Sequence, residues 1–384
     1  MTSNFIYFDN SATTKPYKEV VDSFVRVSTD YFGNPSSLHR IGGEAEKLLS
    51  KGRKQIAEQL GVKPSEIIFT SGGTESNNLA IKGTALMHRK RGNHIITTSV
   101  EHASIKESFR QLEELGFEFT IIPVDHEGRI NVQDVENAIS DQTILVSVMH
   151  VNNEVGTIQP IEKIGNLLKN YPKIIFHVDH IQGVGKVPLN LYKENIDLCS
   201  FSGHKFHGLK GTGLLYIREG VMLSPLFTGG SQERKFRSGT ENVAGMVSLA
   251  KALRLTLENM DEHVQKILPM KETIITGIQD IEEIVVHTPD TGSAPHIINF
   301  SLKGFKAEVF VHALEEKDIY VSTTSACSSK KKTGSNTLSA MGVSEDLVKG
   351  AIRISLSYEN TMEEAHFVVK AIRETVIKLK EVMK

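Results

Sequence analysis

The strongest constraint on the fold is a series of short apolar runs, separated by helix-forming stretches, between about residues 60 and 220. Most of these runs are continuously apolar, which is typical of strands that are buried on both faces of a sheet. Strands that alternate with helices indicate an α/β fold with a mostly parallel sheet covered by helices. The strands that we predict are 67–70, 94–98, 119–123, 144–148, 174–178, 198–201 and 213–217.

The pattern changes after roughly residue 250, where a long amphipathic stretch leads into a second group of elements. A chain of 384 residues is too long for one ordinary core, so we expect two domains. We assign 15–255 to a large domain, and 1–14 with 256–384 to a smaller α+β domain. The later elements that we predict are an amphipathic stretch over 247–281, strands over 297–302, 319–323 and 352–356, a helix over 307–317 and a terminal helix from about residue 362.

The composition excludes several classes of protein. Hydrophobic residues make up 39% and charged residues 23% of the chain, close to the average of soluble globular proteins. The net charge of −2 gives no electrostatic reason to expect nucleic acid or a membrane as partner. The sequence contains neither an apolar stretch of the ~20 residues that a membrane helix needs nor a secretory signal pattern. Two cysteines do not make a disulfide framework, so we expect a cytoplasmic enzyme.

Two chemical groups follow neighbouring predicted strands. Asp179 ends the strand over 174–178, and Lys205 comes just after the strand over 198–201. In parallel sheets ligands bind beyond the carboxyl ends of the strands. A carboxylate and a lysine placed there can hold an aromatic nitrogen cation and a Schiff base, which are the needs of pyridoxal phosphate. Taken singly, Asp179 could be an ordinary turn carboxylate and Lys205 a solvated lysine. Several glycines follow Lys205, however, which is unusual for a solvated face.

A glycine-containing turn over 70–78 follows another strand and opens a helix. Glycines such as Gly73 let a backbone approach a ligand closely, and free N–H groups at a helix start can bind a phosphate. The competing interpretation is a simple turn in which Thr74 caps the helix.

His102 also lies just past a strand end, where an imidazole could stack on a pyridoxal ring and move protons; a structural histidine is equally compatible with the sequence. Arg353 alternates with apolar residues on its strand and could bind a carboxylate in a bidentate way. A structural salt bridge explains Arg353 equally well.

Cys327 lies in a polar segment over 322–336 that reads as an exposed loop. Three lysines that follow it would favour its thiolate, which suggests a reactive cysteine rather than an incidental surface thiol. Cys199 lies inside an apolar strand and is expected to pack in the core. A metal site at His177, Asp179 and His180 is disfavoured, since strand geometry turns His180 away from the other two.

Taken together, these segments resemble the NifS/IscS-type cysteine desulfurases, within the class V aminotransferase-like pyridoxal phosphate enzymes of fold type I. The resemblance covers nearly the whole chain. The matching motifs, in family order, are 8–14, 33–39, 71–78, 152–157, 202–205, 237–242 and 325–329.

The resemblance implies how the cofactor is held. Lys205 would form the Schiff base and later carry a proton, Asp179 would pair with the pyridinium nitrogen, and Gln182 would donate to the phenolic oxygen of the ring. The residues implied to hold the phosphate are Gly73, Thr74, Ser202 and His204, together with Thr240 from the neighbouring subunit of a homodimer.

The resemblance also implies a reaction. His102 would stack on the ring, while Asn153 and Arg353 would place the substrate L-cysteine. Cys327 would attack the substrate sulfur, giving an enzyme persulfide and L-alanine. The sulfur would then pass to an acceptor protein for iron–sulfur clusters, tRNA thiolation or another thio-cofactor.

The sequence leaves open the roles of one histidine and one lysine run, and it leaves three groups of rival functions. His180 stands where these enzymes usually carry a small residue, and we expect it to point away from the ring. The run Lys330, Lys331 and Lys332 is either a solvated cluster, which we favour, or a contact for an acceptor. The rival functions are a class V aminotransferase or selenocysteine lyase, a non-catalytic sulfur-relay protein and, most distant, a metalloenzyme.

Overall fold

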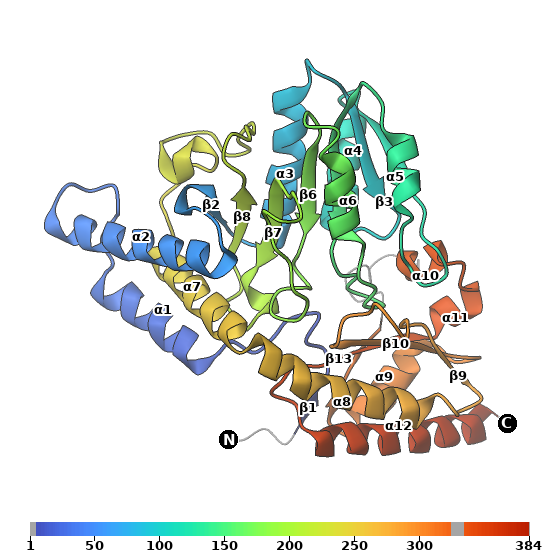
Figure 1. The fold of residues 1–384 in the computed structure, drawn as a ribbon. Helices are drawn as coiled ribbons and strands as arrows, with labels where there is room; N and C mark the ends of the chain where they lie inside the picture. Colours follow the sequence, from blue (N-terminus) through green and yellow to red (C-terminus); the bar gives the residue numbers. More distant parts are fainter. Residues whose placement is uncertain (1–4, 324–333, 384) are drawn as a thin grey trace.

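The computed structural model describes residues 5–323 and 334–383 (Figure 1). Its strands are β1 (Ile6–Tyr7), β2 (Ile67–Thr70), β3 (His94–Thr98), β4 (Glu118–Ile122), β5 (Thr143–Met149), β6 (Ile175–Asp179), β7 (Leu198–Ser202), β8 (Gly213–Ile217), β9 (Ile284–Val286), β10 (Ile297–Leu302), β11 (Ile319–Tyr320), β12 (Ser322–Thr323) and β13 (Ala351–Ser355). Its α-helices are α1 (Lys18–Asp30), α2 (Arg40–Leu60), α3 (Gly73–His88), α4 (Ala103–Glu113), α5 (Val132–Ala138), α6 (Ile161–Leu168), α7 (Val243–Glu258), α8 (Met260–Ile278), α9 (Ala307–Glu315), α10 (Asn336–Ala340), α11 (Glu345–Lys349) and α12 (Met362–Met383).

A seven-stranded sheet forms the centre of the larger part of the molecule, in the order β2-β8-β7-β6-β5-β3-β4. β8 runs antiparallel to both of its neighbours, and the other pairs are parallel. Because β8 is antiparallel to both β2 and β7, β2 and β7 run in the same direction. The prediction of a mostly parallel sheet in an α/β fold is therefore confirmed.

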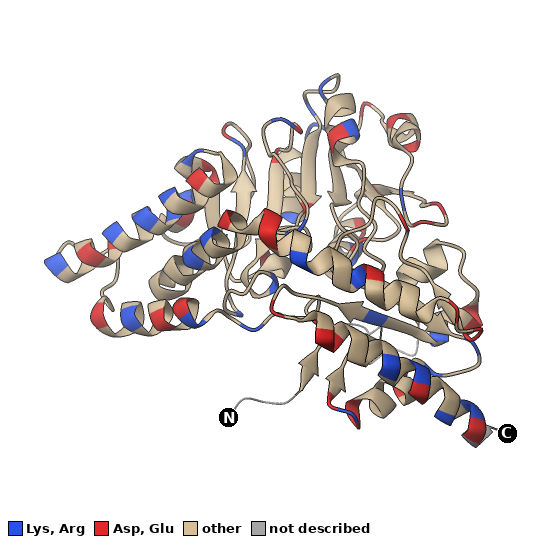
Figure 2. Cartoon of the chain, turned by 60° about the horizontal axis from the view of Figure 1, so that its bottom comes forward, with Lys and Arg blue, Asp and Glu red and all other residues tan. Residues whose placement is uncertain are grey.

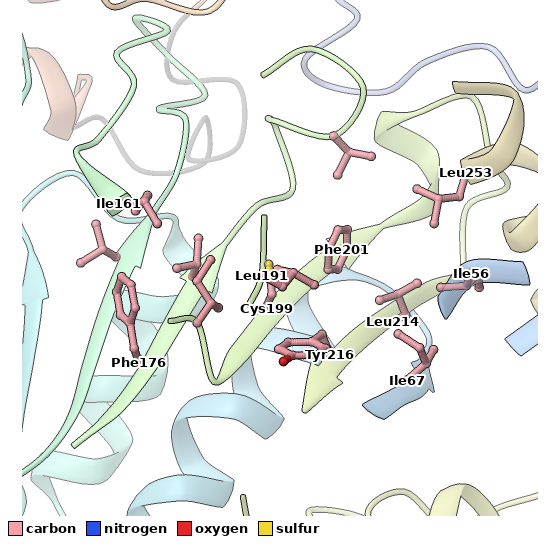
Figure 3. Packing of buried hydrophobic residues seen from close by; sticks show 14 of the residues in the cluster. Ile56, Ile67, Ile161, Phe176, Leu191, Cys199, Phe201, Leu214, Tyr216 and Leu253 are labelled. Carbon is pink, nitrogen blue, oxygen red and sulfur yellow. The ribbon is translucent and has the colours of Figure 1, made fainter. Parts of the chain in front are cut away.

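Alternate residues along each strand pack into two different apolar clusters, one on each face of the sheet. Ile67, Phe69, Phe176 and Tyr216 lie in the cluster that α2, α6 and α7 cover (Figure 3). Ile68 and its counterparts on the other strands pack under α3 and α4. Burial on both faces explains why the strands read as continuous apolar runs in the sequence. Cys199 is fully buried in the first cluster, as expected, and desolvation raises the pKa of its thiol.

Most of the elements after α7, together with β1, form a second layer beneath the first (Figure 1). An antiparallel sheet in the order β12-β13-β10-β9 packs against α8, α9 and α12 around a separate apolar cluster. β1 pairs in parallel with β11, so the first strand of the chain joins this layer, and Phe8 lies in its core. This layer has the α+β character that we expected. The domain boundaries near residues 15 and 255 stay a prediction.

The structure differs from the predicted elements at two places. The stretch over 247–281 is two helices, α7 and α8, which meet at Asn259. The strand expected over 319–323 is divided at Val321, because β11 pairs with β1 whereas β12 pairs with β13 in the other sheet. One predicted strand is thus divided between two sheets.

Within the described ranges, no helix is long and apolar enough to cross a membrane. Positive and negative residues are interspersed along the surface helices, including α12 near the C-terminus (Figure 2). This mixture agrees with the nearly neutral net charge.

Candidate active site

A cavity of about 600 Å³ lies where the carboxyl ends of the parallel strands meet the second layer. β2, β6 and β7 end at the same edge of the sheet because they run in the same direction. The predicted site residues that line this cavity are Gly73, Thr74, His102, Asn153, Asp179, Gln182, Ser202, His204, Lys205 and Arg353. The topology therefore brings together ten residues that are spread over 281 positions of sequence, from 73 to 353.

Asp179 is the last residue of β6 and is 5% exposed. Its Oδ2 accepts a hydrogen bond from Asn77 Nδ2 at 2.8 Å, and its Oδ1 accepts from the Ile181 N–H at 3.0 Å. Burial raises the pKa of Asp179, whereas the hydrogen bonds from the Ile181 N–H and from Asn77 act against that rise. A buried carboxylate at a cavity wall is stabilised by a cation placed in the cavity.

Lys205 lies at the end of the short helical turn 203–205 that follows β7. Its Nζ donates to the carbonyl oxygens of Ser11 at 2.5 Å and Ala12 at 2.9 Å. The backbone of Lys205 is fixed as well, since Lys186 Nζ donates to its carbonyl oxygen at 2.9 Å. Burial, and then the charge of Lys205, lower the pKa of Lys186 to about 7.

The turn between β2 and α3 lies against the end of β7. Gly72 has φ +151°, a conformation that favours glycine. A Cβ at Gly73 would lie 2.2 Å from Ile181 Cδ1 and 3.3 Å from Ser202 Cβ, so the Ile181 side chain would have to move to make room for a larger residue. Thr74 follows in the first turn of α3, where backbone N–H groups are available to an anion. Ser202 lines the cavity beside this turn.

His204 faces the same part of the cavity and forms a hydrogen bond to Thr13 Oγ1 at 3.2 Å. Burial, and then the charge of Lys205, lower the pKa of His204 to about 4. The imidazole is therefore neutral near pH 7 and can act as a hydrogen-bond partner without adding charge.

His102 caps α4, and its Nδ1 accepts from the Ser104 N–H at 3.1 Å. Burial lowers its pKa, so the ring is neutral, and the bond at Nδ1 leaves its proton on Nε2. Ser104 Oγ also accepts from Asn77 Nδ2 at 3.0 Å, which links His102 to Asp179 through one amide.

Gln182 Nε2 donates to the Ser11 carbonyl at 3.0 Å.

Arg353 enters the cavity from β13 of the other sheet, and Ile352 and Ile354 point into the apolar cluster behind it. Its Nη2 donates to Asp9 Oδ1 at 2.8 Å and its Nη1 to the Asn153 carbonyl at 3.0 Å. Among the described residues, its buried Nε has no hydrogen-bond partner. The salt bridge that the sequence left open is present, and the side chain reaches the cavity as well.

One described residue of the predicted site, Thr240, does not line this cavity. Thr240 is exposed and lines a neighbouring hollow of about 160 Å³ with Arg237 and Ser71. Cys327, like the lysine run 330–332, lies outside the described residues.

No cluster of three potential metal ligands occurs in the part of the chain that the structure describes. His177 instead bonds Ser147 and Ser200 through its two ring nitrogens, each at 2.9 Å. His180 lies away from the cavity, paired with His150 at 2.8 Å.

Four residues of the site were not identified from the sequence. Ser11 bonds both Lys205 and Gln182, and Asp9 holds Arg353; both belong to a motif that we noted without assigning a role. Asn77 donates a hydrogen bond to Asp179. Its position within the motif 71–78 was the only feature of the sequence that could have indicated a role for it. Lys186 lies in none of the motifs noted in the sequence, so nothing distinguished it from a solvated lysine.

These residues fit pyridoxal phosphate. The buried carboxylate of Asp179 would be stabilised by a cationic ring nitrogen, Lys205 provides the amine, and the turn at Gly72 and Gly73 lets the backbone at the start of α3 approach a ligand closely. The chain could therefore hold the ring between Asp179 and His102, and the phosphate at the start of α3.

Comparison with known proteins gives a consistent result. Residues 6–368 match the family model described as aminotransferase class-V. The chain is 49% identical to a NifS/IcsS protein homolog of Lactobacillus delbrueckii subsp. bulgaricus, over 96% of each chain. It is 44% identical to the cysteine desulfurase IscS of Methanosarcina thermophila, over 98% of this chain and 93% of that one. A solved NifS-like protein superposes with a TM-score of 0.92 at 39% identity, covering 97% of this chain and 99% of the other.

Proposed function

Because this chain belongs to the class V aminotransferase family and, within it, to the NifS/IscS-type cysteine desulfurases, we propose that it removes sulfur from L-cysteine and releases L-alanine. The predicted family, fold type I and pyridoxal phosphate as cofactor are confirmed by these relatives. When bound, the protonated pyridoxal ring delocalises the negative charge that develops at the substrate Cα.

A single observation supports this function most strongly: Asp179, Lys205 and Arg353 line one cavity although they come from two different sheets. A cofactor-anchoring lysine, a carboxylate for the ring nitrogen and an arginine for a substrate carboxylate are together what an amino acid substrate requires. A relay protein without catalysis has no need for all three.

The protein side chains divide the work. Asp179 accepts hydrogen bonds from Asn77 and the Ile181 N–H, and its carboxylate would stabilise the protonated ring nitrogen of the cofactor. Lys205, whose amine lies beside the cavity, takes a proton from the substrate Cα and returns one. His102, neutral and with its proton on Nε2, is a donor toward the cavity. Arg353 binds the substrate carboxylate, and Asn153 lies beside it on the same wall.

The sulfur leaves as a persulfide on Cys327. The Cys327 thiolate attacks the substrate sulfur, the new S–S bond forms, and the Cβ–S bond breaks with its electron pair delocalised toward Cα. A proton returned to Cβ completes L-alanine. The step needs no external oxidant, since the thiol and cysteine together account for the persulfide and alanine.

Enzymes of this family act on L-cysteine and are typically dimeric. We extend this to a cytoplasmic homodimer in which Thr240 of each subunit reaches the phosphate bound by the other. Its exposure and its place outside the cavity of its own chain support that assignment. We also propose that an acceptor protein takes the sulfur for iron–sulfur clusters, tRNA thiolation or another thio-cofactor.

The test is to incubate the purified protein with L-cysteine and to measure both L-alanine and protein-bound persulfide. We expect both products from the wild type. Cys327→Ala should keep the yellow colour of the bound cofactor and stop alanine formation. Lys205→Ala should lose that colour and form no alanine.

The outcomes separate the rival reactions. Amino-group transfer to a keto acid, without persulfide, would identify an aminotransferase. Turnover of selenocysteine alone would identify a lyase for that substrate. Alanine formation by Cys327→Ala at the wild-type rate would place the nucleophile elsewhere.

A further inference from the structure

Three consecutive residues that are not glycine adopt a left-handed backbone outside the cavity. Glu233, Arg234 and Lys235 have φ angles of 41°, 54° and 68°. Side chains with a Cβ rarely adopt this conformation, and several in a row are costly. Such strain persists only where the surroundings enforce it, often next to a functional site. The contacts of this turn therefore indicate what it is needed for.

Glu233 is held tightly by its surroundings. Its two carboxylate oxygens accept hydrogen bonds from Arg53 Nη1 at 2.9 Å and Nη2 at 2.6 Å. The glutamate side chain is 1% and the arginine 14% exposed. A two-pronged pair of this kind fixes geometry as well as charge.

The same pair bonds the edge strand of the large sheet. β2 is the first strand in the sheet order, so its outer backbone groups face away from β8. On that outer side the Phe69 N–H donates to Glu233 at 2.8 Å, and Arg53 Nη1 donates to the Ile67 carbonyl at 2.6 Å. Residues two apart present their N–H and C=O groups to the same side. The ion pair thus occupies the place of a neighbouring strand, immediately before Thr70.

A second connection reaches the other side of the glycine-containing turn. Arg237 Nε donates to Glu75 Oε1 at 2.9 Å, and Glu75 Oε2 accepts from the Ser71 N–H at 2.8 Å. The segment 233–237 is therefore bonded to the backbone before the turn, at Phe69, and through Glu75 to the backbone within it, at Ser71.

We propose that Glu233 and Arg53 are positioning residues for the phosphate end of the cofactor. They fix the backbone of β2, and thereby the glycine-containing turn that binds the phosphate, and the left-handed turn is kept because it delivers Glu233 to that strand edge. The inference rests on the proposed function in one respect, namely that the turn at 72–74 holds a phosphate.

The test compares two carboxylates that each accept a strand N–H and pair with an arginine, Glu233 near the carboxyl end of β2 and Asp197 near the start of β6. Asp197 also accepts a strand N–H, from Phe176 at 2.9 Å, and pairs with Arg218 at 3.4 Å, but near the start of β6 and away from the cavity. Glu233→Gln and Asp197→Asn are each freed of cofactor and titrated with pyridoxal phosphate. Melting temperatures are measured with and without the cofactor.

We expect Glu233→Gln to raise the dissociation constant of pyridoxal phosphate about tenfold, the worth of one charge-assisted hydrogen bond, and to shrink the rise in melting temperature that the cofactor causes. Asp197→Asn should lower the melting temperature with and without cofactor alike and leave the dissociation constant unchanged. An unchanged dissociation constant in Glu233→Gln, or an equal increase in Asp197→Asn, would overturn the proposal.

Arg53→Lys decides the question if Glu233→Gln does not fold. It keeps the charge but loses the two-pronged contact, so we expect a rise of about threefold in the dissociation constant, and no rise would contradict the positioning role. A protein that binds the cofactor normally but forms no alanine would contradict the proposed function alone.

Discussion

The cavity has a cofactor wall, formed by Asp179, Ser202 and Lys205 at the ends of adjacent strands, and an arginine wall, formed by Arg353 on β13 of the other sheet. On the cofactor wall, Asp179 has a partner on each carboxylate oxygen and Lys205 donates to two carbonyls. On the arginine wall, Arg353 keeps an unpartnered Nε among the described residues.

The difference indicates two kinds of binding. A cofactor that stays bound is best served by groups that are already fixed, because little ordering then remains to be done on binding. A substrate that enters and leaves each cycle needs a group whose present partner can be replaced. Asp9 on Nη2 is such a partner, since a substrate carboxylate could take its place and also engage Nε.

The largest expected effect is on the cofactor wall. Asp179→Asn removes the carboxylate that we propose to balance the ring nitrogen, and we expect kcat for alanine formation to fall by about 10²–10³, or roughly 3–4 kcal/mol. The fold should persist, because Asn77 Oδ1, which has no partner among the residues that the structure describes, can accept from the new amide once the Asn77 side chain rotates.

Rates of alanine formation and melting temperatures, both with saturating cofactor, check this prediction. Asp197→Asn is the matched control, in which the same chemical change lies away from the cavity. A kcat within threefold of the wild type in Asp179→Asn would mean that this wall does not hold the ring nitrogen.

The arginine wall should respond in KM rather than in kcat. Arg353→Lys keeps the positive charge but loses the paired N–H groups, so we expect KM for L-cysteine to rise about 30-fold, roughly 2 kcal/mol. Cofactor affinity should stay unchanged, because we propose that Arg353 binds the substrate carboxylate and not the cofactor. Arg373→Lys, at a surface pair with Asp280, is the control. Weaker cofactor binding in Arg353→Lys would break the distinction between the two walls.

The two walls also differ in how far the sequence could predict them. Apolar runs located the seven central strands within one or two residues, since all of these strands except the edge strand β4 are buried along their whole length and most read as apolar runs. Asp179 and Lys205 each follow such a strand, so the topology of a parallel sheet places them together. For the cofactor wall, local sequence and one topological rule are sufficient.

The partners of these residues could not be predicted in the same way. Asp9 and Arg353 are 344 positions apart, and the isolated bridge between Asp9 and Ser355 that brings Asp9 to β13 involves a single pair of residues. One bridged pair leaves no periodicity in the sequence. Lys186 was missed because burial, and not residue type, distinguishes it from a surface lysine.

The smallest predicted effect is the contribution of Glu101, behind the cofactor wall, to the pH dependence of protein stability. Glu101 lies behind Asp179, and its Oε1 accepts from Thr98 Oγ1 at 2.7 Å and the Met149 N–H at 2.9 Å. Its buried Oε2 has no partner within the described ranges. Burial raises the pKa of Glu101 to about 8. A raised pKa means that the folded protein keeps a proton that the unfolded chain has already lost.

The free energy of unfolding should therefore fall as pH rises from about 4.5 to 8, and this contribution should level off above 8. In Glu101→Gln this contribution is absent. Each pKa unit corresponds to about 1.4 kcal/mol, so between pH 6 and 7.5 we expect the wild type to lose about 1–2 kcal/mol relative to the variant.

Urea unfolding at several pH values measures this difference directly. Glu345→Gln provides the opposite case, because Lys349 lowers the pKa of this surface carboxyl, and its difference from the wild type should be flat above pH 5.5. A flat difference for Glu101→Gln as well would mean that Glu101 is ionised in the folded protein. The cofactor wall would then hold two buried negative charges, and a cationic ring would be needed to balance both of them rather than Asp179 alone.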